Sequence, residues 1–307
     1  LKYNIKWTPQ QSMHSAMKWV SDRYLPSIRA ELAKLEDICE PLMEKAGSAL
    51  SRSEVNKITE FGMLQDHYDE TMMLSLGNIE YLHSNYVLVW DSVMFQFKRL
   101  TGQHTFHKTL APMADKFLFM SSTILDKDGF CEDMGLPVED TAFLSLPSEF
   151  DPKKRPVFYM PQMKMNAKWR DRENVKNQQK MLDSISTLLE MHKDDSGLIH
   201  TSNFSISDWV VKQLAKNKTH RIYHHNPDGG DDRNAIITAF QADPKPSVLI
   251  SPSSTEGLDL KDDLGRFAIV VKLGFPYLGD QWIKRRMEMS SKWYMRKTLV
   301  SLIQGGG

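Results

Sequence analysis

Residues 247–260 read SVLISPSSTEGLDL, and this stretch decides the fold expected for the chain. The apolar run at 248–250 lacks polar alternation, which is typical of a strand buried on both faces of a parallel sheet. Small hydroxyl residues follow it, and then Glu256, Gly257 and Asp259. Glycine permits a close backbone approach, and the carboxylates suit ribose hydroxyls, a metal-bound water or a basic side chain. The alternative is a polar loop in which Asp259 caps a turn.

Strand-like and helix-like runs alternate on both sides of this stretch. Strand-like runs are expected at residues 157–160, 197–201, 221–225, 247–251 and 267–273. Helix-like runs are expected at about 172–192, 206–217, 231–242 and 280–303. Ser205 and Asp208 are predicted to form a capping box for the second helix. Alternation at this spacing predicts right-handed crossovers and therefore an α/β fold with a doubly wound parallel sheet.

Two further polar segments follow predicted strands. Ser121-Ser122-Thr123 ends a strand-like run at 116–120, and Thr201-Ser202-Asn203 ends the run that begins at Gly197. Hydroxyl and amide groups at the carboxyl edge of an open sheet suit phosphate oxygens. Taken alone, however, each segment is more often a turn or a helix cap.

The first 85 residues have a helical pattern. Thr8-Pro9-Gln10-Gln11 and Ser51-Arg52-Ser53-Glu54 are typical helix starts, and apolar residues at helical spacing follow both. Pro26 is expected to interrupt the first helix. A short β-type run at 86–90 comes next. A helical hairpin with one apolar face predicts a packing module and no chemistry.

Composition excludes several classes of protein. The 307 residues include 39 basic and 39 acidic side chains, so a nucleic-acid site must be a local patch. Two cysteines cannot form a disulfide framework or a four-cysteine metal site. No run of 18 apolar residues and no signal peptide is present, so we expect an intracellular, cytoplasmic protein without a membrane partner.

Histidines and basic residues offer weaker signals. His104, His107, His224 and His225 lack nearby carboxylates or cysteines at ligand spacing, so we expect surface or turn histidines and no metal site. The basic residues of the last helix predict a solvated face, or alternatively a nucleic-acid backbone contact. They are Lys284, Arg285, Arg286, Lys292, Arg296 and Lys297.

Taken together, the polar segments resemble the motifs of superfamily 2 helicases, in the order found in the XPD/DinG branch. Ser121-Ser122-Thr123 is similar to the Ser-Ala-Thr motif, with serine in the middle. Ser148-Glu149-Phe150 resembles the Ser-Pro-Phe connection between two motor domains, and residues 197–204 resemble motif IV.

The remaining motifs follow in the same order. Residues 255–260 match the Glu-Gly-x-Asp core of motif V, and Gly274-Phe275-Pro276-Tyr277 matches the Gly-x-Pro-Tyr segment after the next strand. Gln304-Gly305-Gly306-Gly307 resembles the opening of motif VI, which continues with an arginine in the family. The resemblance covers residues 86–307, and the ordered set is far more specific than any single motif.

The resemblance implies a RecA-like, P-loop NTPase type of fold in three parts. These are an arch-like helical insertion at 1–85, the C-terminal part of the first RecA-like motor domain at 86–149, and the second at 150–307, truncated at motif VI. Residues implied at the ATP cleft are Glu256, Gly257, Asp259 and Gln304. Ser121, Ser122 and Thr123 would couple nucleotide state to DNA contacts. The implied nucleic-acid-binding residues are Thr201, Ser202, Asn203, Ser254 and Thr255.

The sequence has no Gly-x-x-x-x-Gly-Lys-Ser/Thr loop and no Asp-Glu-Ala-His-type box. In the family both precede the arch, as do the cysteines of an iron–sulphur cluster where one exists. We therefore expect the full-length protein to be an ATP-dependent DNA helicase that uses ATP and Mg²⁺ on single-stranded DNA, and this chain alone to be inactive. The alternatives are a non-catalytic remnant that binds single-stranded nucleic acid or a partner, and an unrelated α/β enzyme. A Rossmann glycine fingerprint, which would favour the latter, is absent.

Overall fold

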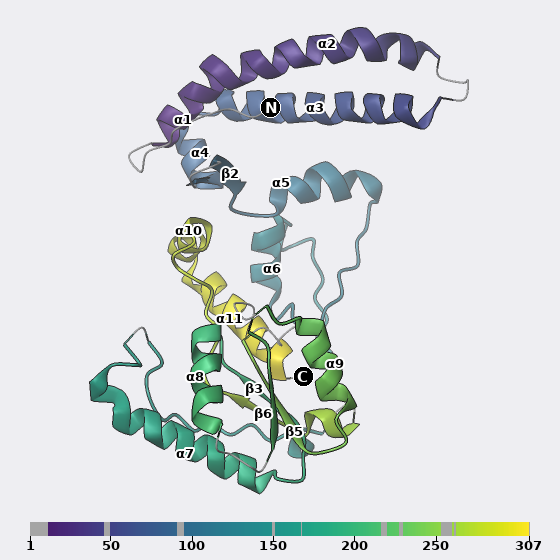
Figure 1. Cartoon of the computed structure of the whole chain (residues 1–307). Coiled ribbons are helices and arrows are strands. Elements are labelled where there is room, and N and C mark those ends of the chain that lie inside the picture. Colours follow the sequence, from purple (N-terminus) through teal and green to yellow (C-terminus); the bar gives the residue numbers. More distant parts are fainter. Residues whose placement is uncertain are drawn as a thin grey trace. The chain divides into compact units, whose positions relative to one another are not determined.

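The computed structural model describes residues 12–45, 50–90, 95–148, 151–166, 168–215, 220–226, 230–252, 260 and 262–306. Two compact units make up the chain (Figure 1). Unit 1 comprises Leu1–Thr105 and Gly279–Arg285, and unit 2 comprises Phe106–Leu278 and Arg286–Gly307. The three-part division expected at residues 85 and 149 stays a prediction.

Unit 1 is built on a long helical hairpin, in which α2 and α3 lie side by side (Figure 1). In chain order its elements are α1 (Met13–Trp19), the π-helical turn η1 (Val20–Tyr24), α2 (Leu25–Glu44), α3 (Arg52–Leu76), α4 (Ile79–Asn85), β1 (Tyr86–Trp90), β2 (Phe95–Arg99) and α5 (Gln103–Thr105). The capping box predicted at Ser51 and Glu54 is confirmed at the start of α3. The start predicted at residues 8–11 lies outside the described residues, and Ser12 caps the first described helix.

The interruption predicted at Pro26 is wrong. Helical structure continues from α1 through η1 into α2, where Pro26 occupies the first turn. Proline has no N–H and its ring crowds the carbonyl of the preceding turn. The wider π-helical turn at Val20–Tyr24 lies directly before it, so the helix continues without a break.

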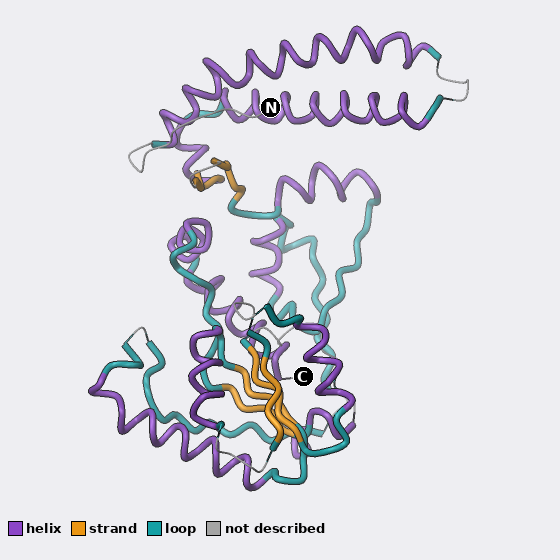
Figure 2. Tube along the Cα trace, viewed as in Figure 1, coloured by secondary structure: helices purple, strands orange, loops and turns teal. Residues whose placement is uncertain are grey.

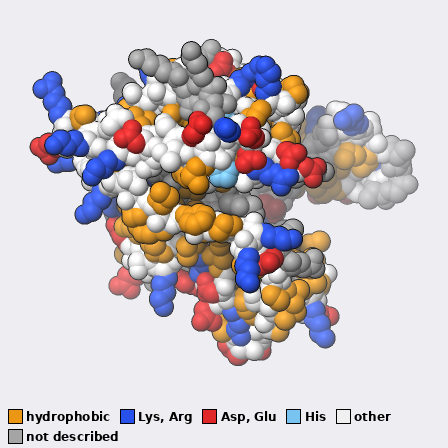
Figure 3. Space-filling view, turned by 90° about the horizontal axis from the view of Figure 1, so that it is seen from below, with side chains coloured by type: hydrophobic (Ala, Val, Ile, Leu, Met, Phe, Trp, Pro, Cys, Tyr) orange, Lys and Arg blue, Asp and Glu red, His pale blue; other side chains and the backbone are white. Residues whose placement is uncertain are grey.

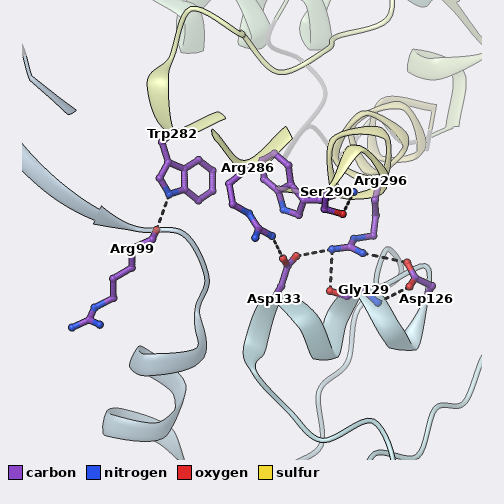
Figure 4. Close-up of polar contacts among 9 residues, drawn as sticks. Arg99, Asp126, Gly129, Asp133, Trp282, Arg286, Ser290 and Arg296 are labelled. Atoms are coloured by element: carbon purple, nitrogen blue, oxygen red, sulfur yellow. Dashed lines mark hydrogen bonds and ion pairs between the residues drawn. The ribbon is translucent and has the colours of Figure 1, made fainter. Parts of the chain in front are cut away.

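A small antiparallel pair completes unit 1. The strand predicted at 86–90 is confirmed as β1, and it pairs with β2 so that Tyr86 faces Arg99 and Trp90 faces Phe95. The Arg99 guanidinium lies 5.0 Å from the centroid of the Tyr86 ring. Trp282 Nε1 donates to the Arg99 carbonyl oxygen at 2.7 Å (Figure 4).

Unit 2 contains a four-stranded, fully parallel sheet in the order β4-β5-β3-β6. Figure 2 shows its strands in orange between helices. The strands are β3 (Gly197–His200), β4 (Arg221–His224), β5 (Ser247–Ser251) and β6 (Phe267–Val270). The helices are α6 (Lys127–Met134), α7 (Val175–Met191), α8 (Phe204–Leu214), α9 (Arg233–Ala242) and α11 (Ser291–Gly306). Helix α10 (Gln281–Met289) belongs to unit 1 up to Arg285 and to unit 2 from Arg286. Short helical turns are η2 (Phe106–Leu110), η3 (Ala111–Met113), η4 (Pro152–Lys154), η5 (Arg172–Asn174) and η7 (Asp262–Gly265).

The predicted α/β fold is confirmed by this sheet. All five residues of β5 are buried, as its unbroken apolar run predicts. Helices α7 and α8 lie on one face of the sheet and α9 lies on the other (Figure 1). The core between α7, α8 and the sheet includes Ile185, Val210, Ile199, Val248 and Ile250. Burial of these side chains is the main stabilising contribution to the unit.

Two predicted strands are wrong. Residues 116–120 and 157–160 have no strand structure. Several of their apolar side chains face solvent, with Leu118 84 % and Val157 95 % exposed, whereas Phe119 packs against Phe106 and Phe130. A strand needs hydrogen bonds to a neighbour, and no strand in the described part of the chain pairs with either run. The predicted strand at 267–273 is confirmed only as far as Val270.

Gly197 lets β3 approach β6 closely. A Cβ at this position would lie 2.6 Å from the Phe267 carbonyl oxygen, so the Gly197→Ala substitution must displace one of the two strands. We expect a loss of about 1–3 kcal/mol in the free energy of opening of β3 and β6, measured by native-state hydrogen exchange. Gly274→Ala is the control, because the nearest atom to its added Cβ lies 3.7 Å away. Equal exchange in the two variants would contradict this prediction.

Candidate functional site

The carboxyl ends of three neighbouring strands meet in one row. His200, the last residue of β3, is in register with Ser251 of β5 and Val270 of β6. Two backbone bonds continue this register beyond the strands: Thr201 N donates to the Ser251 carbonyl oxygen at 3.3 Å, and Val271 N donates to the His200 carbonyl oxygen at 2.8 Å. The polar segments after β3 and β5 therefore start at the same edge of the sheet, as the sequence predicts.

Part of this edge lies outside the described residues. The predicted ligand residues Ser254, Thr255, Glu256, Gly257 and Asp259 all belong to that part, and their roles stay predictions. The same holds for Glu149 and Phe150 of the predicted connection between motor domains.

Thr201 has a packing role in this structure. Its side chain is completely buried, and its hydroxyl lies 2.6 Å from the hydroxyl of Ser207 on α8. Thr201 therefore holds the start of α8 against β3, and its role in binding nucleic acid stays a prediction.

Asn203 caps α8. Its side-chain oxygen accepts a hydrogen bond from Ile206 N at 2.9 Å. The capping box predicted at Ser205 and Asp208 is wrong, because the cap lies at Asn203 instead. An N-cap acceptor satisfies a backbone donor that the helix itself leaves free, so the side-chain oxygen of Asn203 is already engaged.

Ser202 has a conformation that packing does not explain. Its φ is +71°, in the left-handed region, although it is not a glycine. Its hydroxyl oxygen is buried and has no hydrogen-bond partner among the described residues. Both features destabilise the fold, and such strain tends to collect at functional sites.

His200 brings the end of α11 to the same edge. His200 is 4 % exposed, and neither ring nitrogen makes a hydrogen bond of good geometry within the described parts of the chain. Burial lowers the pKa of His200, and the neighbouring backbone of Gly305 opposes that shift. Gln304, predicted for the ATP cleft, precedes Gly305 and is exposed. The segments that resemble motifs IV and VI therefore lie close together.

Residues 185–307 match the family model described as helicase C-terminal domain. This part of the chain is similar to helicase C-terminal domains, and we refer to it as the helicase domain. The match supports the DinG/XPD/Rad3-like group in general and singles out no member. No curated protein matches the chain. Within the described residues, no helix is long and apolar enough to cross a membrane.

Before the helicase domain, Ser121-Ser122-Thr123 forms a turn. The Ser121 hydroxyl accepts a hydrogen bond from Thr123 N at 3.2 Å, and residues 116–120 directly before it form no strand. Leu125 has a φ of +71°, and Asp126 then caps α6 by accepting from Gly129 N at 2.6 Å. The local structure is thus the hydroxyl turn that the sequence allows, and the coupling role stays a prediction.

The basic residues on the last helices of the helicase domain do not form one solvated face. Arg286 is 1 % exposed and pairs with Asp133, and Arg296 pairs with Asp133 at 2.8 Å. These partners lie far away in the sequence, so helical spacing alone could not reveal them. Lys and Arg side chains are interspersed with Asp and Glu over the face seen in Figure 3.

A cation that the sequence pattern did not single out lies at the start of α8. Arg170 Nη2 donates to the Ser205 carbonyl oxygen at 2.5 Å, and its guanidinium lies 4.9 Å from the centroid of the Trp169 ring. Trp169 is buried against Trp209, which fixes its ring. A positive charge is therefore held beside the segment that resembles motif IV.

The predicted surface histidines differ from one another. His224 Nε2 lies 3.4 Å from Asp208 Oδ1, and burial lowers the pKa of His224 while Asp208 opposes the shift. His224 is therefore mostly buried, which corrects the expected surface position. The His107 ring lies 3.3 Å from the Gly135 carbonyl oxygen, and His104 lies 3.8 Å from Glu70. Among the described residues, no three potential ligands are grouped to hold a metal ion.

His200 makes the stability of the helicase domain depend on pH. The folded state disfavours the protonated ring, whereas the unfolded chain takes up a proton near the ordinary pKa of 6.5. Stability is therefore complete above about pH 6.5 and falls as the pH drops below it. His200→Leu removes the titrating group, so its urea midpoint should fall less between pH 7 and pH 5 than that of the wild type.

Urea unfolding followed by circular dichroism at several pH values measures this difference. His14→Gln, at an exposed position, serves as the control and should follow the wild type. The same pH dependence in His200→Leu and in the wild type would show that His200 titrates normally.

Proposed function

We propose that this helicase C-terminal domain is the second RecA-like motor domain of an ATP-dependent DNA helicase of the XPD/DinG type. The complete enzyme would move along single-stranded DNA and unwind duplex DNA, in DNA repair or replication, in the cytoplasm. The observation that carries the proposal is the common edge of β3, β5 and β6, from which the segments resembling motifs IV and V begin.

By likeness to motifs V and VI, Glu256, Gly257, Asp259 and Gln304 would form one wall of an ATP site. We call the part of the edge where they would lie its nucleotide side, and the part formed by the segment after β3 its DNA side. In NTPases of this type, a glycine-rich loop and its lysine bind the phosphates of ATP, and carboxylates lie close to the Mg²⁺. The sequence carries no such loop. This chain therefore fits a partial site only, and no step of hydrolysis is assigned to it. An iron–sulphur cluster, if the complete protein has one, would also be held outside this chain.

The DNA side of the edge is better supported by described residues. Ser202 has a buried hydroxyl without a partner among them, and α8, an 11-residue helix, starts two residues later with the N–H groups of Phe204 and Ser205, ahead of the Ile206 N–H that Asn203 caps. Arg170 adds a positive charge beside this start. Neutral hydroxyl and N–H donors with one cation match the phosphate backbone of a single strand, which carries no sequence information.

A second candidate is a non-catalytic module that binds single-stranded nucleic acid or a partner protein. The lack of a phosphate loop in the sequence favours it. The two candidates differ in one property, because only the helicase turns over ATP.

The ATP-hydrolysing role is tested on the complete protein. Single-stranded DNA should stimulate its ATP turnover, and this chain alone should have none. Glu256→Gln should lower the turnover by about tenfold or more and leave DNA affinity nearly unchanged, because the side chain is assigned to the nucleotide side. Glu139→Gln, at an exposed position outside the helicase domain, is the control. A complete protein that binds DNA without any ATP turnover would favour the non-catalytic module.

The DNA-binding role is tested by salt dependence. Ser202→Ala should weaken single-strand binding about fivefold, equivalent to about 1 kcal/mol for one neutral hydrogen bond, and leave the salt slope unchanged. Arg170→Ala should instead reduce the salt slope, which is the change in log binding constant with log salt concentration, by about 0.7. The substitution removes one positively charged side chain that contacts the phosphate backbone. Lys212→Ala, in the last turn of the same helix, is the control.

Fluorescence anisotropy with a labelled oligonucleotide at several salt concentrations measures both effects. If neither Ser202→Ala nor Arg170→Ala alters binding, the strand lies on another face of the domain.

A further inference from the structure

An acidic side chain on α6 is shared by two arginines from the last helices of unit 2. The Asp133 carboxylate pairs through one oxygen with Arg286 on α10 and through the other, at 2.8 Å, with Arg296 on α11 (Figure 4). Arg296 also donates to the Gly129 carbonyl oxygen at 2.9 Å and lies 3.6 Å from the Asp126 carboxylate. Asp126, Gly129 and Asp133 are thus all tied to α11.

Burial makes this interaction difficult to replace. Arg286 is 1 % exposed, and its guanidinium lies 4.8 Å from the centroid of the Trp293 ring, which is itself buried. Two of its nitrogens, Nε and Nη1, have no hydrogen-bond partner among the described residues. Asp133 is therefore the group that neutralises a buried cation, and removing it would leave that charge uncompensated.

Gly129 shows that the fit between α6 and α11 is close. A Cβ on this residue would lie 1.3 Å from Arg296 Nη1, so no other residue fits without moving the guanidinium. Cys131, on the same helix, is 1 % exposed. Cys131 lies two residues from both Gly129 and Asp133, on another side of α6, so its burial reports the packing of α6 as a whole.

The interaction joins two segments that the proposed function uses. Asp126, at the start of α6, closely follows the Ser121–Thr123 turn, and α11 leads on from Arg296 to Gln304. We infer that Asp133 is a positioning residue that makes the turn and the end of α11 move together. This inference rests on the proposed function for the coupling, but the docking of α6 does not depend on it.

Docking is tested on the chain itself by thiol labelling. In Asp133→Asn, N-ethylmaleimide should label Cys131 about tenfold faster than in the wild type, or more, because release of α6 exposes the thiol. Mass spectrometry of the peptides measures the rates. Cys39, buried in unit 1, is the internal reference, and Glu132→Gln, an exposed neighbour on α6, is the matched control.

Two further measurements separate release of α6 from unfolding of the unit. Hydrogen exchange in β3 must stay slow in Asp133→Asn. Asp133→Glu, which keeps the charge, should restore part of the protection of Cys131. A protected Cys131 in Asp133→Asn overturns the docking role of Asp133.

Coupling is tested on the complete protein by the number of base pairs unwound per ATP hydrolysed. Asp133→Asn should lower this ratio by about threefold or more, whereas fewer folded molecules alone would lower unwinding and ATP turnover together and leave the ratio unchanged. An unchanged ratio overturns the positioning role. A wild-type protein without ATP turnover overturns the proposed function and the coupling with it, while the labelling result still stands.

Discussion

The structure of unit 2 depends on the pairing of β3 with both β5 and β6. The central strand is short, and its first residue, Gly197, must lack a side chain because the Phe267 carbonyl oxygen occupies the space. This close approach brings His200, Ser251 and Val270 into one row. That row positions the polar segment after β3 through the backbone bond of Thr201 to Ser251, and it places the end of α11 beside His200.

Sequence pattern predicts all four strands of the parallel sheet, and it also predicts two strands that do not form. The run at 247–251 is apolar because both of its faces are covered, and its bounds agree with the prediction. The runs at 116–120 and 157–160 are equally apolar, yet within the described chain they remain unpaired. An apolar composition indicates that a segment can form a strand, but the strand forms only where a neighbouring strand supplies hydrogen bonds. That neighbour cannot be found from the segment's own residues.

The candidate site could be located from the sequence, but the roles within it could not. The polar segment after β3 lies at the edge of the sheet, as predicted. Thr201 and Asn203 nevertheless engage their polar groups with α8, through Ser207 and Ile206 N. The pairing of Arg286 and Arg296 with Asp133 joins segments that are distant in the sequence, and no periodic pattern carries such information.

Packing and capping do not explain the backbone conformation and the buried hydroxyl of Ser202. A purely structural turn at this position would favour glycine or asparagine, since φ is +71°, and would leave no buried hydroxyl unpaired. Thr201 and Asn203 on either side are explained by packing and capping, so the strain is confined to the one residue between them. A ligand oxygen would supply the missing partner and would offset the conformational cost only when bound. The segment after β3 therefore combines two residues that hold the loop in place with one strained residue whose buried hydroxyl has no partner among the described residues, and the proposed phosphate contact would supply that partner.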